Sequence, residues 1–178
     1  MKVYYWAEHT SLFTANTGIQ RVTRGLARAH QDNGVAVHAL KWAESDRRFT
    51  SLTAREAEHL GRWNGPYADR LGTFDAGLEG RWLLVPELVV EPHRPPLAFL
   101  IRMARRHGMK VGVVFYDALP YRLDALYAPE AKAAHGRYME SLLLAGSTPT
   151  RSARRRSAGA RSRCLRTPES ARHSSGRG

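Results

Sequence analysis

A threonine, a glycine and an arginine stand together at a predicted helix start, in an arrangement that suits a bound anion. Thr17 is a good N-cap residue, and Gly18 would let a ligand approach the backbone closely. The free N–H groups of a first helical turn favour negative charge, to which Arg21 would add a guanidinium. The same residues also make an ordinary helix start, so both interpretations stay open at this point.

Carboxylates follow two other predicted strands. The segment Pro86–Pro92 holds Glu87 and Glu91, and carboxylates at strand ends can bind hydroxyl groups or act as bases. The alternative for this segment is a solvated loop. Asp117 comes directly after an apolar run, beside Tyr116, where it either belongs to a site or caps the next turn.

Metal and dinucleotide chemistry have no pattern in this sequence. The 8 histidines show no HxxxH spacing, and the single cysteine, Cys164, lies in a segment without apolar character. No GxGxxG fingerprint is present, which disfavours a nucleotide-dependent oxidoreductase or epimerase. We therefore expect neither a metal nor a bound cofactor. His30, at a position that faces a predicted core, is interpreted as a packing residue.

The elements that must position these residues alternate between strands and helices. Strands are predicted over Lys2–Ala7, Val35–Lys41, Arg81–Pro86 and Lys110–Tyr116, and helices over Gly18–Asn33, Ala54–Trp63, Pro96–His107 and Glu130–Ala145. Glu8–Asn16 is predicted to be a loop. The pattern predicts an α/β fold, a Rossmann-like parallel sheet with flanking helices. Ligands bind such sheets outside the carboxyl ends of the strands.

Two of these elements carry more specific expectations. In the first helix, Ile19, Val22, Leu26 and Ala29 recur on one side, while Arg21, Arg24 and Arg28 line another. The run from Lys110 is nearly all apolar, as a strand buried on both faces should be. Thr53 and Glu56 have the spacing of a capping box.

The sequence changes character at Gly146. Residues 146–178 contain no Val, Ile, Met, Phe, Tyr or Trp, and their nine arginines and one glutamate supply +8 of the net charge of +12. Such a segment cannot bury enough apolar surface to offset its ordering entropy, so a disordered Arg/Ser-rich tail is predicted after an incomplete domain of residues 1–145. A shifted reading frame is the favoured origin, and a genuine basic arm is the alternative. Sequencing the gene downstream of the Ala145 codon would separate the two.

The rest of the chain reads as a cytoplasmic protein, with peripheral membrane contact as an open possibility. The N-terminus lacks a signal peptide's apolar stretch, and no run of about 18 apolar residues occurs. The helix Pro96–His107 combines apolar residues with Arg102, Arg105 and Arg106. Such a helix either rests on anionic lipid or, as is more common, packs its apolar side into a core.

Two segments together resemble a known family. The run TGIQRV at 17–22, with the following RGLARA at 24–29 and NGV at 33–35, resembles the first helix of retaining glycosyltransferases of family 4. The run VVFYDALP at 113–120, with Pro129-Glu130, resembles that family's V-x-F-H-D-L-I-P…P-E stretch. Both occur in the family's order and at about its separation, and the likeness covers roughly residues 1–145. Tyr116 stands where many relatives have histidine.

The resemblance implies a GT-B fold, in which two Rossmann-like domains face each other across a cleft. This chain would then be the incomplete acceptor-side half, because the donor domain and its E-x7-E motif are not found in the expected context. It implies that the Thr17–Gly18 loop approaches the donor diphosphate, with Arg21 in an unassigned role, and that Tyr116, Asp117 and Glu87 line the cleft. The implied substrates are a nucleotide sugar and a saccharide or lipid-linked acceptor, as in polysaccharide biosynthesis. No turnover is expected from this chain alone.

A second function belongs to another class. If the tail is genuine, its arginines could bind nucleic acid in a sequence-independent, salt-dependent way. Deleting the tail would abolish that binding and would leave a transferase half unaffected.

Overall fold

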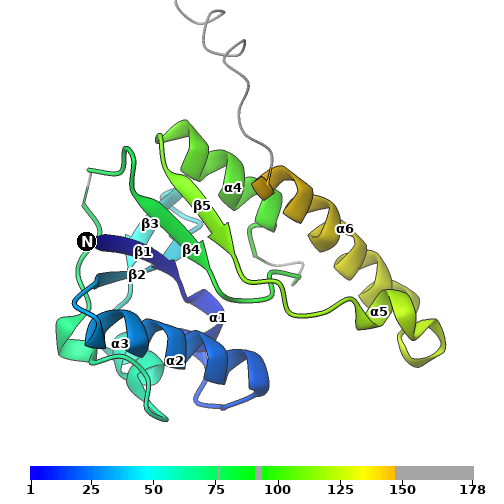
Figure 1. The fold of residues 1–178 in the computed structure, drawn as a ribbon, viewed down its shortest axis with the longest axis horizontal. Coiled ribbons are helices and arrows are strands. Elements are labelled where there is room, and N and C mark those ends of the chain that lie inside the picture. The colour runs from blue at the N-terminus through cyan, green and yellow to red at the C-terminus, as the bar shows by residue number, and fades with distance from the viewer. Residues whose placement is uncertain (76, 91–93, 147–178) are drawn as a thin grey trace, which may run out of the picture. The chain divides into compact units, whose positions relative to one another are not determined.

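The computed structural model contains one five-stranded sheet at its centre (Figure 1). The strands are β1 (Lys2–Trp6), β2 (Ala36–Ala43), β3 (Arg48–Ser51), β4 (Trp82–Val85) and β5 (Lys110–Val113), in the order β3-β2-β1-β4-β5. All pairs are parallel except β2 with β3, which is antiparallel. The prediction of an α/β, Rossmann-like parallel sheet with flanking helices is confirmed.

Helices cover both faces of the sheet, as the alternation of side chains along β1 requires. Val3 and Tyr5 point into one core with α2 (Gly18–Asp32) and α3 (Ala54–Gly61). Tyr4 and Trp6 point into the other, larger core. That core is covered by α4 (Leu97–Arg106) and α6 (Pro129–Gly146). Shorter elements are α1 (Glu8–Leu12), α5 (Leu119–Arg122) and the 3-10 turns Ala68–Arg70 and Asp124–Leu126.

Local signals fixed most helix ends. α2 begins at Gly18 after Thr17, whose N–H donates to the Gln20 side chain at 2.9 Å, and it is followed by Gly34 at φ +73°. In α3 the predicted capping box forms, since Thr53 N–H donates to Glu56 and Glu56 N–H donates back to Thr53 Oγ1. The apolar side of α4 is buried through Leu97, Leu100, Ile101 and Ala104, so this helix packs into the core rather than on lipid.

Three expectations about elements were wrong. Strand β3 was not predicted, although it forms a hairpin with β2 across a four-residue turn. The segment expected to be a loop from Glu8 instead begins with α1. Strand β5 is not buried on both faces, because it is last in the sheet order and its residues Val111, Gly112 and Val113 are only half-buried.

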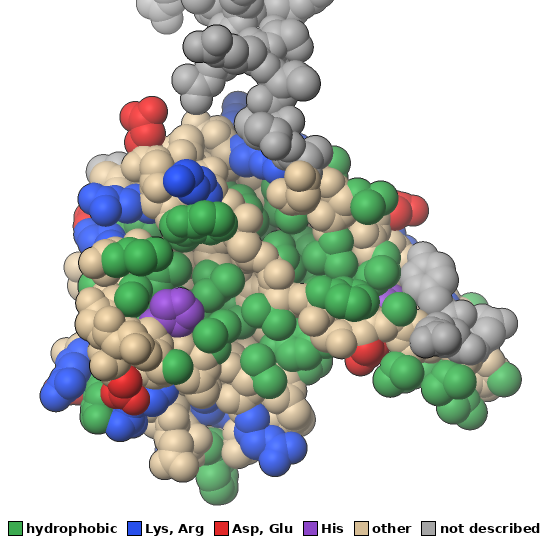
Figure 2. All heavy atoms as spheres, in the orientation of Figure 1, with side chains coloured by type: hydrophobic (Ala, Val, Ile, Leu, Met, Phe, Trp, Pro, Cys, Tyr) green, Lys and Arg blue, Asp and Glu red, His purple; other side chains and the backbone are tan. Residues whose placement is uncertain are grey.

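The structure describes residues 1–75, 77–90 and 94–146. The predicted tail, Gly146 apart, and Glu91 lie outside the described residues, and Gly146 is the last residue of α6. None of the helices described here has both the length and the apolar character needed to cross a bilayer. Hydrophobic side chains gather on the face that carries β5, α5 and α6 (Figure 2). The exposed large hydrophobic residues after β5 include Phe115, Leu119, Leu126 and Leu143.

Two glycines test the packing in opposite directions. A Cβ at Gly65 would lie 2.1 Å from the Leu60 carbonyl oxygen, a backbone atom that cannot move aside, whereas a Cβ at Gly25 in α2 meets nothing within 4 Å. Gly65→Ala should therefore lower the free energy of unfolding by about 1–3 kcal/mol, as overpacking does. Gly25→Ala should raise it by about 0.5–1 kcal/mol through helix propensity. Urea denaturation of both variants measures this, and a loss of stability in Gly25→Ala would contradict the placement of that helix face.

Candidate functional site at the carboxyl edge of the sheet

The residues singled out in the sequence follow three strands that end at one edge of the sheet. The segment leading to α2 follows β1, Glu87 follows β4, and Tyr116 follows β5. Because β1, β4 and β5 are parallel, their carboxyl ends lie side by side. Segments some 100 residues apart in the sequence thereby meet at one site.

Glu87 is at the centre of this edge and is not in a solvated loop. Its side chain is 2% exposed. The carboxylate accepts hydrogen bonds from the backbone N–H groups of Thr10, at 2.7 Å, and His9, at 2.9 Å. These N–H groups belong to the first turn of α1. Glu87, which follows β4, therefore caps a helix that is distant in the sequence. This long-range cap explains why α1 forms where the sequence predicted a loop.

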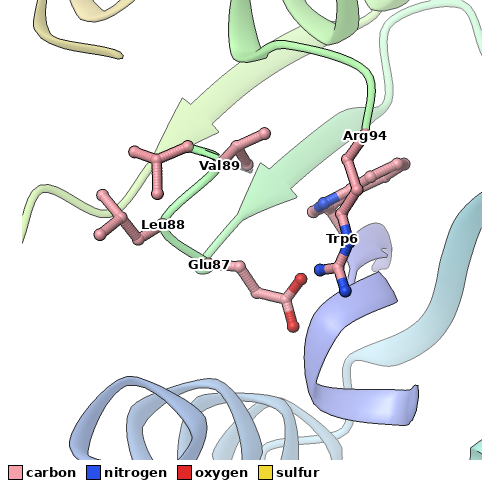
Figure 3. Close-up of a pocket in the computed structure, with 6 residues that line it drawn as sticks. Trp6, Glu87, Leu88, Val89 and Arg94 are labelled. Carbon is pink, nitrogen blue, oxygen red and sulfur yellow. The ribbon is translucent and has the colours of Figure 1, made fainter. Parts of the chain in front are cut away.

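Opposing effects act on the pKa of Glu87. Burial raises the pKa of Glu87, while the two backbone hydrogen bonds and the positive charge of Arg94 act to lower it, and burial dominates. Figure 3 shows the Glu87 carboxylate and the Arg94 guanidinium turned toward each other beside α1. The cavity between them, also lined by Trp6, has a volume of about 10 Å³, which is room for no more than one water.

Arg24 is the second buried charge at this edge. It is 0% exposed, and its guanidinium donates to the carbonyl oxygens of Ala15 at 2.8 Å, Phe13 at 3.2 Å and His59 at 3.2 Å, with a longer contact to Thr10. It also donates to the Asn16 side chain at 3.1 Å. Burial lowers the pKa of Arg24, but an arginine keeps its proton in proteins. Arg24 thus holds the segment between α1 and α2 in one conformation.

The expectation for the faces of α2 was therefore wrong. Its buried residues are Gln20, Thr23, Arg24 and Ala27, while Val22, assigned to the apolar side, is 43% exposed. Arg24 belongs to the buried side because the preceding segment offers it carbonyl groups rather than apolar side chains.

Tyr116 joins the ends of β4 and β5 to α2. Its hydroxyl donates to the Pro86 carbonyl oxygen, the residue before Glu87. The Thr23 hydroxyl of α2 reaches the same oxygen at 3.5 Å. Burial raises the pKa of Tyr116. Tyr116 therefore acts as a neutral hydrogen-bond donor that fixes the strand end carrying Glu87.

The remaining site residues predicted from the sequence are exposed to solvent. Thr17, Gly18 and Arg21 face solvent at the start of α2, and a Cβ on Gly18 would meet no atom within 4 Å. Asp117 is exposed, and its carboxylate accepts from Leu119 N–H at 3.1 Å, which is the turn-capping role left open in the sequence. His30 packs edge-on against Tyr5 in the core, as predicted.

Sequence reasoning missed Arg24 and Arg94 as parts of this site. Arg24 does stand in the helix at i+3 from Arg21, but nothing local distinguishes the buried arginine from the exposed one. Among the described residues no three His, Cys, Asp or Glu side chains cluster as metal ligands would.

Comparisons with known proteins gave no relative. No protein-family model matches the sequence, and no curated protein or solved structure matches it significantly. The site must therefore be interpreted from its own geometry.

Replacing Arg24 by methionine tests its structural role. Arg24→Met removes the donor from at least three carbonyl groups that are at least partly buried in the fold, so we expect the free energy of unfolding to fall by about 2–4 kcal/mol. Arg21→Met, on the exposed side of the same helix, should change it by less than about 0.5 kcal/mol. Equal effects in urea denaturation of the two variants would show that Arg24 is not the buried member of the pair.

Glu87 should make stability depend on pH. Because its folded-state pKa is raised above the unfolded value near 4.5, its proton stabilises the fold. That contribution is complete below about pH 4.5 and is lost as the pH rises through the folded-state pKa. Glu87→Gln removes the titration, so its stability relative to the parent should improve between pH 4.5 and 8. Urea midpoints across this range measure the difference, and a difference that stays constant with pH would contradict the raised pKa.

Proposed function

We propose that residues 1–145 form an incomplete acceptor-side domain of a retaining GT-B glycosyltransferase, whose reaction moves a hexosyl group from a nucleotide sugar to a saccharide or lipid-linked acceptor. One observation carries the proposal. The two segments that resemble family 4, at the start of α2 and after β5, meet at one edge of the sheet through the Thr23–Pro86–Tyr116 contact. The contact between the two segments supports the proposal.

The chemistry of such a transfer asks for stabilisation of a departing diphosphate and for a surface that orients the acceptor. The exposed start of α2, with Gly18 unobstructed and Arg21 beside it, is suited to approach by a diphosphate. Glu87 and Tyr116 would shape the floor of the cleft rather than take part in proton transfer, since both are engaged in hydrogen bonds within the fold.

Most of the catalytic requirement would be met outside this chain. In a GT-B enzyme the nucleotide is held mainly by the second domain, and the reaction takes place when the two domains close on each other. The proposal therefore assigns acceptor binding to this chain and expects no sugar transfer by it alone.

A nucleic-acid-binding function is the competing proposal. It rests on the arginines of residues 147–178, because the described part of the chain carries only an ordinary share of the charge. It predicts binding that disappears with the tail and weakens steeply with salt.

Deleting residues 147–178 separates the two proposals. We expect the shortened chain to retain its unfolding temperature and its affinity for saccharide acceptors, while losing affinity for duplex DNA and single-stranded RNA. Ligand-observed NMR with a saccharide panel and fluorescence anisotropy with labelled oligonucleotides provide the two measurements. If neither form of the chain binds any saccharide, free or lipid-linked, the transferase proposal fails. Sugar transfer by the full chain from UDP- or GDP-hexoses would contradict the expectation that it is incomplete.

A further inference from the structure

Two clefts adjoin the Glu87 region, and they differ in chemistry. The first, which we call the polar cleft, has a volume of about 460 Å³ and lies between the β2–β3 hairpin, with Glu44 and Arg47, and the start of α4, with Phe99. The second, the apolar cleft, has a volume of about 320 Å³ and lies between Val89–Val90 after β4 and Tyr138 of α6. Each volume falls within the range of small-molecule sites.

The polar cleft suits a sugar. Its wall is aromatic, with Phe99 packed edge-on against Trp42 at 4.9 Å. The Trp42 indole N–H donates to one oxygen of Glu44, whose position is thereby fixed while lone pairs remain to accept from hydroxyl groups. Arg47 has an unusual backbone, with φ at +49°, and within residues 1–75, 77–90 and 94–146 its guanidinium has no hydrogen-bond partner. Arg47 is the last residue of the β2–β3 turn, and as a lining residue of the cleft it can donate to the oxygens of a ligand.

The apolar cleft suits a hydrocarbon chain that ends in negative charge. Val89, Val90 and Leu97 line it, and so does Arg137 of α6. The Arg137 guanidinium has no hydrogen-bond partner in the described part of the chain. An apolar groove with an arginine beside it is complementary to an amphiphile whose headgroup is anionic.

Arg94 and Pro96 line both clefts, so the clefts meet at Arg94. The guanidinium of Arg94 also lies next to the Glu87 carboxylate, which fixes its position at the site edge (Figure 3). With five N–H donors an arginine can serve a carboxylate and a phosphate together. The apolar cleft therefore leads to Arg94, and Arg94 leads to the polar cleft with its aromatic wall and the Glu44 carboxylate.

We propose that these two clefts form one acceptor site for a lipid-linked sugar, with the chain in the apolar cleft, its phosphate at Arg94 and Arg137, and its first sugar in the polar cleft. This proposal rests on the proposed function only in taking the sugar to be the acceptor. It selects the lipid-linked class from the two acceptor classes that the family resemblance leaves open.

Binding of short soluble probes to the full chain tests the proposal. The probes are geranyl phosphate, geraniol, inorganic phosphate and glucosyl-phosphoryl-geraniol, titrated at physiological salt with tryptophan fluorescence and calorimetry. We expect geranyl phosphate to bind at least roughly tenfold more tightly than geraniol or phosphate, because only it engages both the apolar wall and the arginines. The glucosyl probe should bind more tightly still.

Three single variants assign the contacts. Arg137→Ala should lower the affinity for geranyl phosphate and for glucosyl-phosphoryl-geraniol by roughly tenfold, because one charge-assisted hydrogen bond is lost. Arg47→Ala should weaken only the glucosyl probe. Arg102→Ala, on the exposed side of α4, is the matched control and should change neither. Thermal melting of each variant confirms that it is folded.

The outcomes separate the two proposals. If all three variants bind equally, or geraniol and phosphate match geranyl phosphate, the lipid-linked site is wrong and the binding is non-specific. If free saccharides bind at the polar cleft with no gain from the lipid, this inference fails while the proposed function stands. If geranyl phosphate binds but the sugar adds nothing and Arg47→Ala has no effect, the chain part of the site stands, whereas its role as a sugar acceptor is contradicted.

Discussion

The buried guanidinium of Arg24 is the constraint on which the site depends. A charge removed from water must be matched by hydrogen bonds, and Arg24 obtains them from backbone carbonyls on both sides of the site, those of the segment before α2 and that of His59 in α3. The segment from Thr10 to Asn16 leaves its large apolar side chains, Leu12 and Phe13, about half exposed, so this cation rather than a hydrophobic contact fixes its path. The hydrogen bonds of Arg24 thereby also fix the position of the exposed start of α2.

Glu87, after β4, is a second buried polar group whose hydrogen bonds hold neighbouring segments in place. Its carboxylate caps α1, and Arg94 lies against it. The carbonyl oxygen of the preceding residue, Pro86, accepts hydrogen bonds from the Tyr116 and Thr23 hydroxyls. The ends of β1, β4 and β5 are therefore joined by polar contacts at the very edge where an open parallel sheet binds ligands. Glu87 and Arg94 leave little empty space between them, so ligand space lies outward, in the clefts that share Arg94. A rigid polar floor beneath open clefts is suited to orient a substrate.

Sequence patterns predicted the features that depend on near neighbours. The apolar and β-branched runs gave four of the strands, Thr53 with Glu56 gave a cap, and Gly34 gave the end of α2. The missed strand β3 lies in a local hairpin, but the errors at the site depend on contacts between distant residues. α1 requires Glu87, which is 77 residues from Thr10, and Arg24 is buried only because carbonyls from two other segments surround it. Thr17, Gly18 and Arg21 lie exposed where α2 was predicted to begin, yet the buried residues that hold the preceding loop in place carry no local signal.

Amide hydrogen exchange of an Arg24→Lys variant measures the central claim most directly. Lysine keeps the charge, but its single ammonium cannot reach carbonyls on several sides as the planar fork does. The account predicts exchange at least roughly tenfold faster for backbone amides between Thr10 and Ile19 and near-parental protection in β1, β2 and β4. Unchanged protection of the Thr10–Ile19 segment, in a variant shown to bury the lysine, would contradict the claim that the Arg24 guanidinium fixes the site.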